Sequence, residues 1–193
     1  MKRIILASQS PRRRELLTQI GLKFEVIPST VEEVITSANP VEVVQELAQQ
    51  KARDVAEVAG REMAKDSLLV IGADTIVVYE GKILGKPEDK EDAVRMLTML
   101  QGKEHSVYTG VALFSGEQEI FFSEETRVQM CPMTPEEILW YVNTGEPMDK
   151  AGAYGIQGLC ARFIRQIQGD YNNVVGLPVG RIYQELKKEE GVF

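Results

Sequence analysis

The strongest constraint on the fold lies in residues 67–79, where the sequence reads SLLVIGADTIVVY. The stretch from Leu68 to Gly72 carries no charge. A continuous apolar run of this length is typical of a strand that other elements cover on both faces. It therefore predicts a buried strand in an α/β domain. The carboxylate of Asp74 follows the run directly, which predicts that Asp74 lies near a strand end.

Capping signals mark several helices along the chain. Ser10 and Pro11 form an N-cap and first-position pair, and Gly21 predicts the end of that helix. Further helices are predicted at residues 39–59, 89–102, 134–145 and 177–190. Two of them carry capping-box signals, namely Asn39 with Glu42 and Thr134 with Glu137.

Strand signals alternate with these helices. Short strands are predicted at residues 3–6 and 24–28, and the strand beyond Asp74 is predicted to turn at Glu80 and Gly81. Residues 105–130 predict a long antiparallel hairpin that turns at Ser115 and Gly116. The chain of 193 residues is thus expected to form a single mixed α/β domain, residues 1–193, with room for two lobes.

Charge and hydropathy exclude some classes of function. The net charge is −7, which disfavours general nucleic-acid binding because such binding depends on many basic phosphate contacts. The sequence has no apolar run of the length that a membrane span requires, and the apolar run of residues 4–7 is too short for a signal peptide. We therefore expect a cytoplasmic protein with no nucleic-acid or membrane partner.

Histidine and cysteine usage narrows the chemistry. His105 is the only histidine, which excludes a multi-histidine metal site and disfavours a Ser-His-Asp triad; we interpret it as a structural or surface residue. Cys131 and Cys160 lack metal-type spacing and are expected to be free, buried thiols, with one disulfide between them as the alternative.

Three arginines, Arg12, Arg13 and Arg14, follow Ser10 and Pro11 at a predicted helix start. Cations are locally unfavourable there because the N-terminus of a helix carries partial positive charge. One interpretation is that the arginines point into solvent. The other is that Ser8, Ser10, the loop amides, Arg12 and Arg13 converge on the oxygens of a triphosphate, which the forked guanidinium can bind in pairs.

Asp74 and Lys86 offer complementary chemistry. Alone, Asp74 is interpreted either as a turn residue or as a general base or metal ligand in a cleft. A hairpin between the two motifs, GADT and LGKP, would bring Lys86 towards Asp74. A lysine beside phosphate and an aspartate beside metal is a usual division of roles in phosphoryl chemistry.

Other polar motifs are ambiguous when taken singly. Glu32 and Glu33 in TVEEV are typical of a solvated surface, and Lys51 is unremarkable on its helix. The segment DKAGAYGIQG, residues 149–158, has the glycine spacing G-x-x-G-x-x-G, which differs from the dinucleotide-binding fingerprint. It is either an ordinary glycine-rich loop or one whose backbone closely approaches something flat or charged.

Five motifs in order carry a family resemblance: LASQSPRRRELL, GADT, LGKP, DKAGAYGIQG and VVGLP, which together span residues 6–178. Any one of them is weak, but five at fitting distances are specific. The chain resembles the Maf family of nucleotide pyrophosphatases. The resemblance implies a curved mixed β-sheet flanked by helices, with two lobes around a deep cleft, similar to inosine triphosphate pyrophosphatases.

The resemblance also implies an activity and a set of residues. Members hydrolyse a nucleoside triphosphate to the monophosphate and pyrophosphate with a divalent metal, and the AYGIQG version is similar to the branch that acts on dTTP and UTP. Many members are homodimers, and the family is linked to inhibition of septum formation. Asp74 matches the proton acceptor, and the other matching positions are Ser8, Arg12, Arg13, Glu33, Lys51, Thr75, Lys86 and Gln157.

The residues are compatible with this implied chemistry. Metal-assisted attack of water on the α-phosphorus would leave Asp74 as proton acceptor, with Arg12, Arg13 and Lys86 neutralising the departing pyrophosphate. Carboxylates without histidines favour Mg²⁺ or Mn²⁺, with Asp74 and Glu33 as the expected ligands. Two alternatives remain open: a pyrophosphatase for a modified purine nucleotide such as 7-methyl-GTP, and a non-catalytic nucleotide-binding regulator of cell division.

Overall fold

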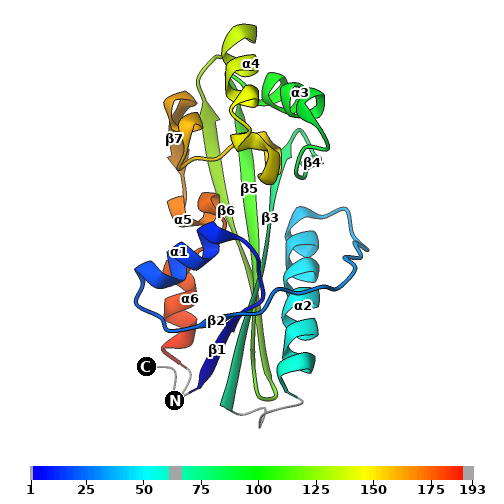
Figure 1. Ribbon diagram of the computed structural model, residues 1–193, viewed down its shortest axis with the longest axis vertical. Helices are drawn as coiled ribbons and strands as arrows, with labels where there is room; N and C mark the ends of the chain where they lie inside the picture. Colours follow the sequence, from blue (N-terminus) through cyan, green and yellow to red (C-terminus); the bar gives the residue numbers. More distant parts are fainter. Residues whose placement is uncertain (1, 61–66, 189–193) are drawn as a thin grey trace. The chain divides into compact units, whose positions relative to one another are not determined.

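A computed structural model describes residues 2–60 and 67–188 as alternating helices and strands (Figure 1). The longer helices begin where the capping signals predict. The elements in chain order are β1 Arg3–Leu6, α1 Pro11–Gln19, β2 Glu25–Val26, α2 Pro40–Ala59, β3 Leu68–Tyr79, β4 Lys82–Leu84, α3 Lys90–Leu100, β5 Glu104–Ser115, β6 Gln118–Met130, α4 Pro135–Asn143, β7 Ile164–Gln168, α5 Tyr171–Val175 and α6 Val179–Leu186.

Within the described residues, the strands form one seven-stranded sheet in the order β2-β1-β3-β5-β6-β7, with β4 paired to β3. Strand β1 runs parallel to β2 and β3, whereas β4 and β7 pair antiparallel to β3 and β6. The mixed α/β class is therefore confirmed. None of the described helices is long and apolar enough to cross a membrane.

The chain divides into two compact units. Unit 1 contains residues 1–74, 109–124 and 176–193, and unit 2 contains residues 75–108 and 125–175. The sequence analysis left room for two lobes, and the structure divides into two compact units. The expected cleft and the expectation of one domain over residues 1–193 stay predictions.

In unit 1, helix α2 packs on one face of the sheet, with α1 and α6 on the other side (Figure 1). Strand alternation explains this, since Ile5 and Val70 contact the apolar stripe of α2 while their neighbours in sequence point the opposite way. Two strand glycines allow α2 to come close. A Cβ on Gly72 would lie 2.3 Å from Ala48 O, and one on Gly110 would lie 2.1 Å from Val44 O.

In unit 2, helices α3 and α4 pack against each other over a core that includes Leu97, Leu100, Met130 and Tyr141. The predicted capping box of α4 is confirmed: Thr134 Oγ1 accepts from Glu137 N, and Glu137 Oε2 accepts from Thr134 N. The capping box predicted for α2 forms only in part. Asn39 caps the helix, whereas the carboxylate of Glu42 accepts a hydrogen bond from Ser37 Oγ.

Some predicted boundaries were wrong. Asp74 lies in the middle of β3 because the β-branched residues after it continue the strand and pair with β4; what ends near it is the pairing with β1, at Leu6 and Ile71. The second strand is shorter than predicted, only Glu25–Val26. Strand β7 was not predicted because its sequence, IRQIQ, does not alternate clearly between apolar and polar residues. Helix α6 ends at Leu186, and residues 189–190 of its predicted range lie outside the described residues.

Candidate functional site

The loop between β1 and α1 carries the first group of candidate residues. Ser8 is buried with only 8% exposure, and its Oγ accepts from Ser10 N at 3.3 Å. Ser10 is the N-cap of α1 as predicted, although its side chain caps no backbone N–H among the described residues. The loop is therefore folded back on the buried hydroxyl of Ser8, directly before the N-terminus of α1.

Arg13 is the buried arginine of the three. Its Nε donates to Gly176 O at 2.8 Å, and its Nη1 donates to Ser8 Oγ at 3.1 Å and Ala73 O at 2.9 Å. Burial lowers the pKa of Arg13, and the charge of Asp74 opposes that shift. Arg13 thus ties the loop after β1 to the backbone beside Asp74. The solvent interpretation fits Arg14, which is exposed, and Arg12 is only half-buried.

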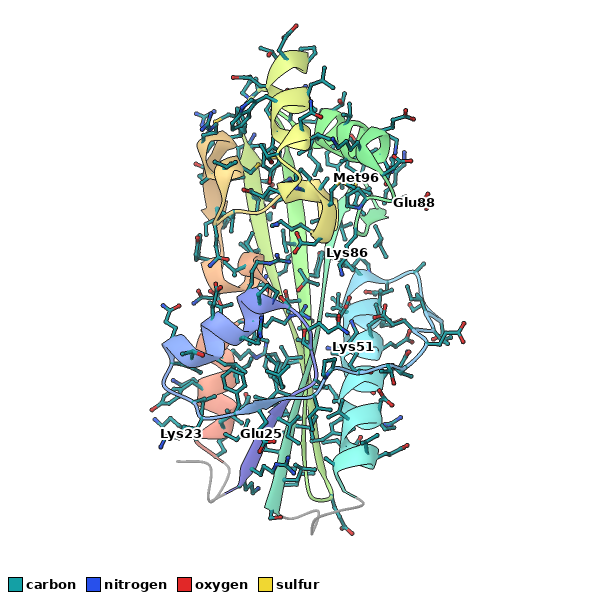
Figure 2. All side chains as sticks on the ribbon, viewed as in Figure 1. Lys23, Glu25, Lys51, Lys86, Glu88 and Met96 are labelled. Atoms are coloured by element: carbon teal, nitrogen blue, oxygen red, sulfur yellow. The ribbon has the colours of Figure 1, made fainter. Side chains whose placement is uncertain are left out.

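Lys51 joins the two candidate carboxylates within unit 1. Its Nζ lies 2.5 Å from Asp74 Oδ1 and 2.9 Å from Glu33 Oε1, and it extends from α2 (Figure 2). The side chains of Lys51 and Asp74 are both 16% exposed, whereas that of Glu33 is 47% exposed. Residues that look unremarkable singly in the sequence therefore form one cluster of a cation between two anions.

The cluster meets part of the requirement for a divalent metal. No group of three metal-ligating His, Cys, Asp or Glu side chains occurs in the described part of the chain. Two carboxylates, Asp74 and Glu33, nevertheless converge on one cation, the ammonium of Lys51. Mg²⁺ is commonly bound by one or two carboxylates together with water and substrate phosphates, so this donor set fits the metal expected from the sequence.

Three other candidates belong to unit 2. Thr75 follows Asp74 on β3 and is half-buried, while Lys86 and Gln157 are exposed. Lys86 follows the short strand β4 as the sequence predicts (Figure 2). That these residues meet Asp74 at one site stays a prediction.

The glycines of residues 149–158 do allow a close approach, and the partners are side chains of the same unit. A Cβ on Gly158 would lie 2.4 Å from Glu146 Oε1, and one on Gly155 would lie 2.6 Å from Lys150 Cε. The carboxylate of Glu146 also accepts from Leu159 N at 2.9 Å and from Tyr141 Oη at 2.8 Å. Glu146 was not singled out in the sequence; its only signal is its place just before this motif.

Other polar residues have structural roles. His105 is buried and its Nε2 lies 2.7 Å from Tyr154 Oη, as a structural histidine would; burial lowers its pKa to about 4. Both cysteines are free. Cys160 is buried, with its pKa raised to about 12 chiefly by burial, whereas Cys131 is only partly buried. The backbone acceptors of Arg13, Ala73 O and Gly176 O, left no sequence signal because they are not side chains.

Sequence comparison relates this chain to known proteins. The family model described as Maf-like protein matches residues 3–189. The chain is 55% identical to a dTTP/UTP pyrophosphatase of Agathobacter rectalis, over 97% of this chain and 98% of that protein. It is 52% identical to a dTTP/UTP pyrophosphatase of Bacillus cytotoxicus, over 97% of this chain and 96% of that protein.

A solved structure gives the same fold. The Staphylococcus aureus Ham1 protein is similar with a TM-score of 0.51 at 15% identity, covering 98% of this chain and 100% of that one. At this identity the likeness concerns the fold alone. The family match and the two relatives, which extend over nearly all of the sequence, show that this chain belongs to the Maf-like protein family.

Proposed function

We propose that the protein is a nucleoside triphosphate pyrophosphatase that hydrolyses dTTP and UTP to the monophosphate and pyrophosphate. The observation that carries this proposal is the match over nearly full length to two relatives with that name, at 55% and 52% identity. The cluster of Arg13, Lys51 and Asp74 supports it, because basic groups and a carboxylate at one place suit the hydrolysis of a polyanion.

Asp74 is proposed as the proton acceptor for the attacking water. Lys51 holds one carboxylate oxygen of Asp74 at 2.5 Å, which orients the group. Arg13 fixes the backbone at Ala73, so the carboxylate also stands on a constrained stretch of β3. Pre-set orientation of a base lowers the barrier because less reorganisation is needed in the transition state.

Asp74 and Glu33 are proposed to hold Mg²⁺ or Mn²⁺ together with the substrate. When bound, the ion would supply charge stabilisation at the phosphoryl oxygens. Lys51 would stay beside Asp74 Oδ1 and add positive charge near the phosphates. Ser8, Ser10 and Arg12 would bind phosphate oxygens, and Lys86 would neutralise the leaving pyrophosphate.

Gln157 and Thr75 are proposed to contribute to base selection. The Gln157 amide can donate to O4 and accept from N3–H of uracil or thymine. Cytosine presents the reverse pattern, so a held amide would leave two groups mismatched, each at a cost of about 1–3 kcal/mol when buried. We expect dTTP and UTP above CTP, and CTP above ATP and GTP.

The deciding experiment combines a nucleotide panel with Asp74→Asn. Hydrolysis in ¹⁸O-water should label the monophosphate and release pyrophosphate, and chelation should abolish it. Asp74→Asn should lower turnover by at least about 10²–10⁴-fold, the usual loss for a general base, with nucleotide binding retained. Products of diphosphate and phosphate, or full activity in the variant, would contradict the proposal.

We further propose that the protein is a cytoplasmic homodimer, on the strength of the family resemblance. Light scattering of the purified chain after size exclusion measures the mass directly. A mass twice that of the 21.6 kDa chain would support the dimer, and a monomer mass would contradict it.

A further inference from the structure

The segment that carries Glu33 is attached to α2 in an unusual way. Residues 27–37 have no regular secondary structure, yet several of them form hydrogen bonds to side chains of α2 between Glu42 and Asp54. Two of their large apolar side chains, Val34 and Ile35, are 56% and 55% exposed. Burial of these side chains therefore does not hold the segment in place.

Four polar side chains of α2 hold it instead. They recur every four residues, a spacing that puts them on one face of the helix. We call them the polar ladder: Glu42, Glu46, Gln50 and Asp54.

Each member of the ladder binds its own part of the segment. Glu42 accepts from Ser37 Oγ at 2.5 Å, and Glu46 accepts from Thr36 N at 3.1 Å and Thr36 Oγ1 at 2.5 Å. At the other end, Asp54 accepts from Ser29 Oγ at 2.7 Å and from Thr30 N at 2.9 Å. The segment therefore runs antiparallel to the helix, and one ladder residue in each turn of the helix binds it.

Gln50 is the neutral member and makes the contact nearest to Glu33. Its Oε1 accepts from Val34 N at 2.9 Å, and its Nε2 donates to Val34 O at 2.6 Å. This pair satisfies both backbone groups of one residue, as a neighbouring strand would. Among the members of the ladder, Gln50 alone can do so, because a carboxylate accepts but does not donate.

The charges of the ladder agree with a role as acceptors. Carboxylates four residues apart on a helix repel each other unless donors compensate. Hydrogen bonds from Thr36 lower the pKa of Glu46, and hydrogen bonds from Ser29 and Thr30 lower that of Asp54. The segment supplies the donors that make this acidic helix face favourable.

Fixing Val34 also fixes its neighbour Glu33. Glu33 Oε1 lies 2.9 Å from Lys51 Nζ, and Lys51 follows Gln50 on α2. The Glu33 side chain is 47% exposed, so burial holds it only weakly. The position of Glu33 beside Lys51 and Asp74 therefore depends on the Val34 backbone, to which Gln50 is hydrogen-bonded.

We propose that Gln50 is a positioning residue that holds Glu33 at Lys51 and Asp74 through its paired hydrogen bonds to Val34. This inference rests on the proposed function for its catalytic consequence. Its structural consequence, an ordered segment 29–37, is independent of which substrate the protein takes.

A double-mutant cycle tests the catalytic part. Gln50→Ala should lower kcat/KM for dTTP about five- to tenfold, as expected for losing one or two hydrogen bonds that orient a reacting group. The same change in a Glu33→Gln background should have an effect below about twofold, because the residue that it positions is already disabled. Gln49→Ala, a glutamine of the same helix outside the ladder, is the matched control and should be near wild type.

Amide hydrogen exchange tests the structural part without activity. Peptides covering residues 29–37 should exchange faster in Gln50→Ala than in the wild type or Gln49→Ala. Peptides of β3 should be unchanged, which separates local release from general unfolding.

The outcomes separate the two proposals. Unchanged exchange in Gln50→Ala, or an equal loss of kcat/KM with and without Glu33, would overturn the positioning role. Absence of pyrophosphate release by the wild type would refute the proposed function. In that case exchange alone decides on Gln50: faster exchange confined to residues 29–37 supports it, and unchanged exchange refutes it.

Discussion

Arg13 is a cation enclosed by the protein's own carbonyl groups. The helical period places residues 13, 16 and 17 of α1 on the buried side, so one arginine of three turns inward. Its hydrogen bonds to Gly176 O and Ala73 O connect segments far apart in the sequence. Its position beside Asp74 therefore serves both the fold and the proposed site.

Arg13→Lys is expected to reduce stability and activity together. The planar guanidinium of Arg13 donates to Gly176 O and Ala73 O at the same time. A lysine ammonium keeps the charge but lacks this forked geometry, so at least one buried carbonyl loses its partner. The free energy of unfolding in urea should fall by about 1–3 kcal/mol. Arg14→Lys, at the exposed neighbouring position, should stay within about 0.5 kcal/mol of wild type. Equal stability of the two variants would contradict the structural role of Arg13.

His105 is expected to make stability depend on pH. Its pKa falls from 6.5 to about 4 through burial, so between these values the unfolded chain binds a proton that the folded chain does not. Stability should therefore drop as the pH falls through this range.

The comparison with His105→Gln isolates this effect because all other titrating groups are shared. We compare the free energies of unfolding of the wild type and the variant at pH 7 and at pH 4.5. Between these two pH values, the wild type should lose about 2–3 kcal/mol more than the variant does. Urea unfolding at both pH values measures it. A difference that is independent of pH would show that His105 titrates normally.

At the scale of elements, the contact between α2 and β3 determines where the site cluster forms. Lys51 lies on the helix and Asp74 on the strand, and their ion pair requires the two elements to be close. Gly72 provides that closeness, since any side chain there would meet the α2 backbone at Ala48 O.

Gly72→Ala is expected to destabilise the protein. The added Cβ would lie 2.3 Å from Ala48 O, and a helix backbone cannot move aside cheaply. We expect a loss of about 1–3 kcal/mol, as is usual for overpacking, and a matching decrease in activity because Lys51 would shift. Gly180→Ala is the control: nothing lies within 4 Å of its Cβ, so it should be neutral or stabilising by up to about 1 kcal/mol. Wild-type stability in Gly72→Ala would contradict this account.

At the scale of the whole molecule, the two units are interleaved along the chain. Unit 1 comprises three separate segments, and β3, β5 and β6 each contribute residues to both units. Neither unit can therefore be cut out as one continuous piece. We expect strands that continue from one unit into the other to couple the unfolding of the two units.

Unfolding is accordingly expected to be one cooperative transition. Trp140, the single tryptophan, reports on unit 2, whereas far-UV circular dichroism reports on all helices and strands. The two urea midpoints should coincide in the wild type. They should also shift together in Gly72→Ala, although Gly72 belongs to unit 1. Two separate midpoints would show that the units unfold independently.

The sequence by itself determined the fold class and the ends of most helices, and it proposed a set of site residues. Capping pairs such as Thr134 with Glu137, and the apolar run before Asp74, act over a few residues and can be read locally. The five ordered motifs indicated the family, which the comparisons confirmed. Strand pairing involves distant residues, so the sequence predicted strand on both sides of Asp74 but could not show that pairing with β1 ends near it while pairing with β4 continues.

Only the tertiary structure decided which polar residues belong together. No local pattern in the sequence links Glu33, Lys51 and Asp74. Lys51 and Asp74 meet because α2 packs on β3, and Glu33 joins them because the polar ladder fixes the segment that carries it. Likewise, the sequence singled out Arg12 and Arg13 from Arg14, but it could not show that the guanidinium of Arg13 binds Gly176 O and Ala73 O, because those carbonyls lie on distant segments. The physical reason is the same in each case: these interactions join residues far apart along the chain, and local pattern carries no information about such distances.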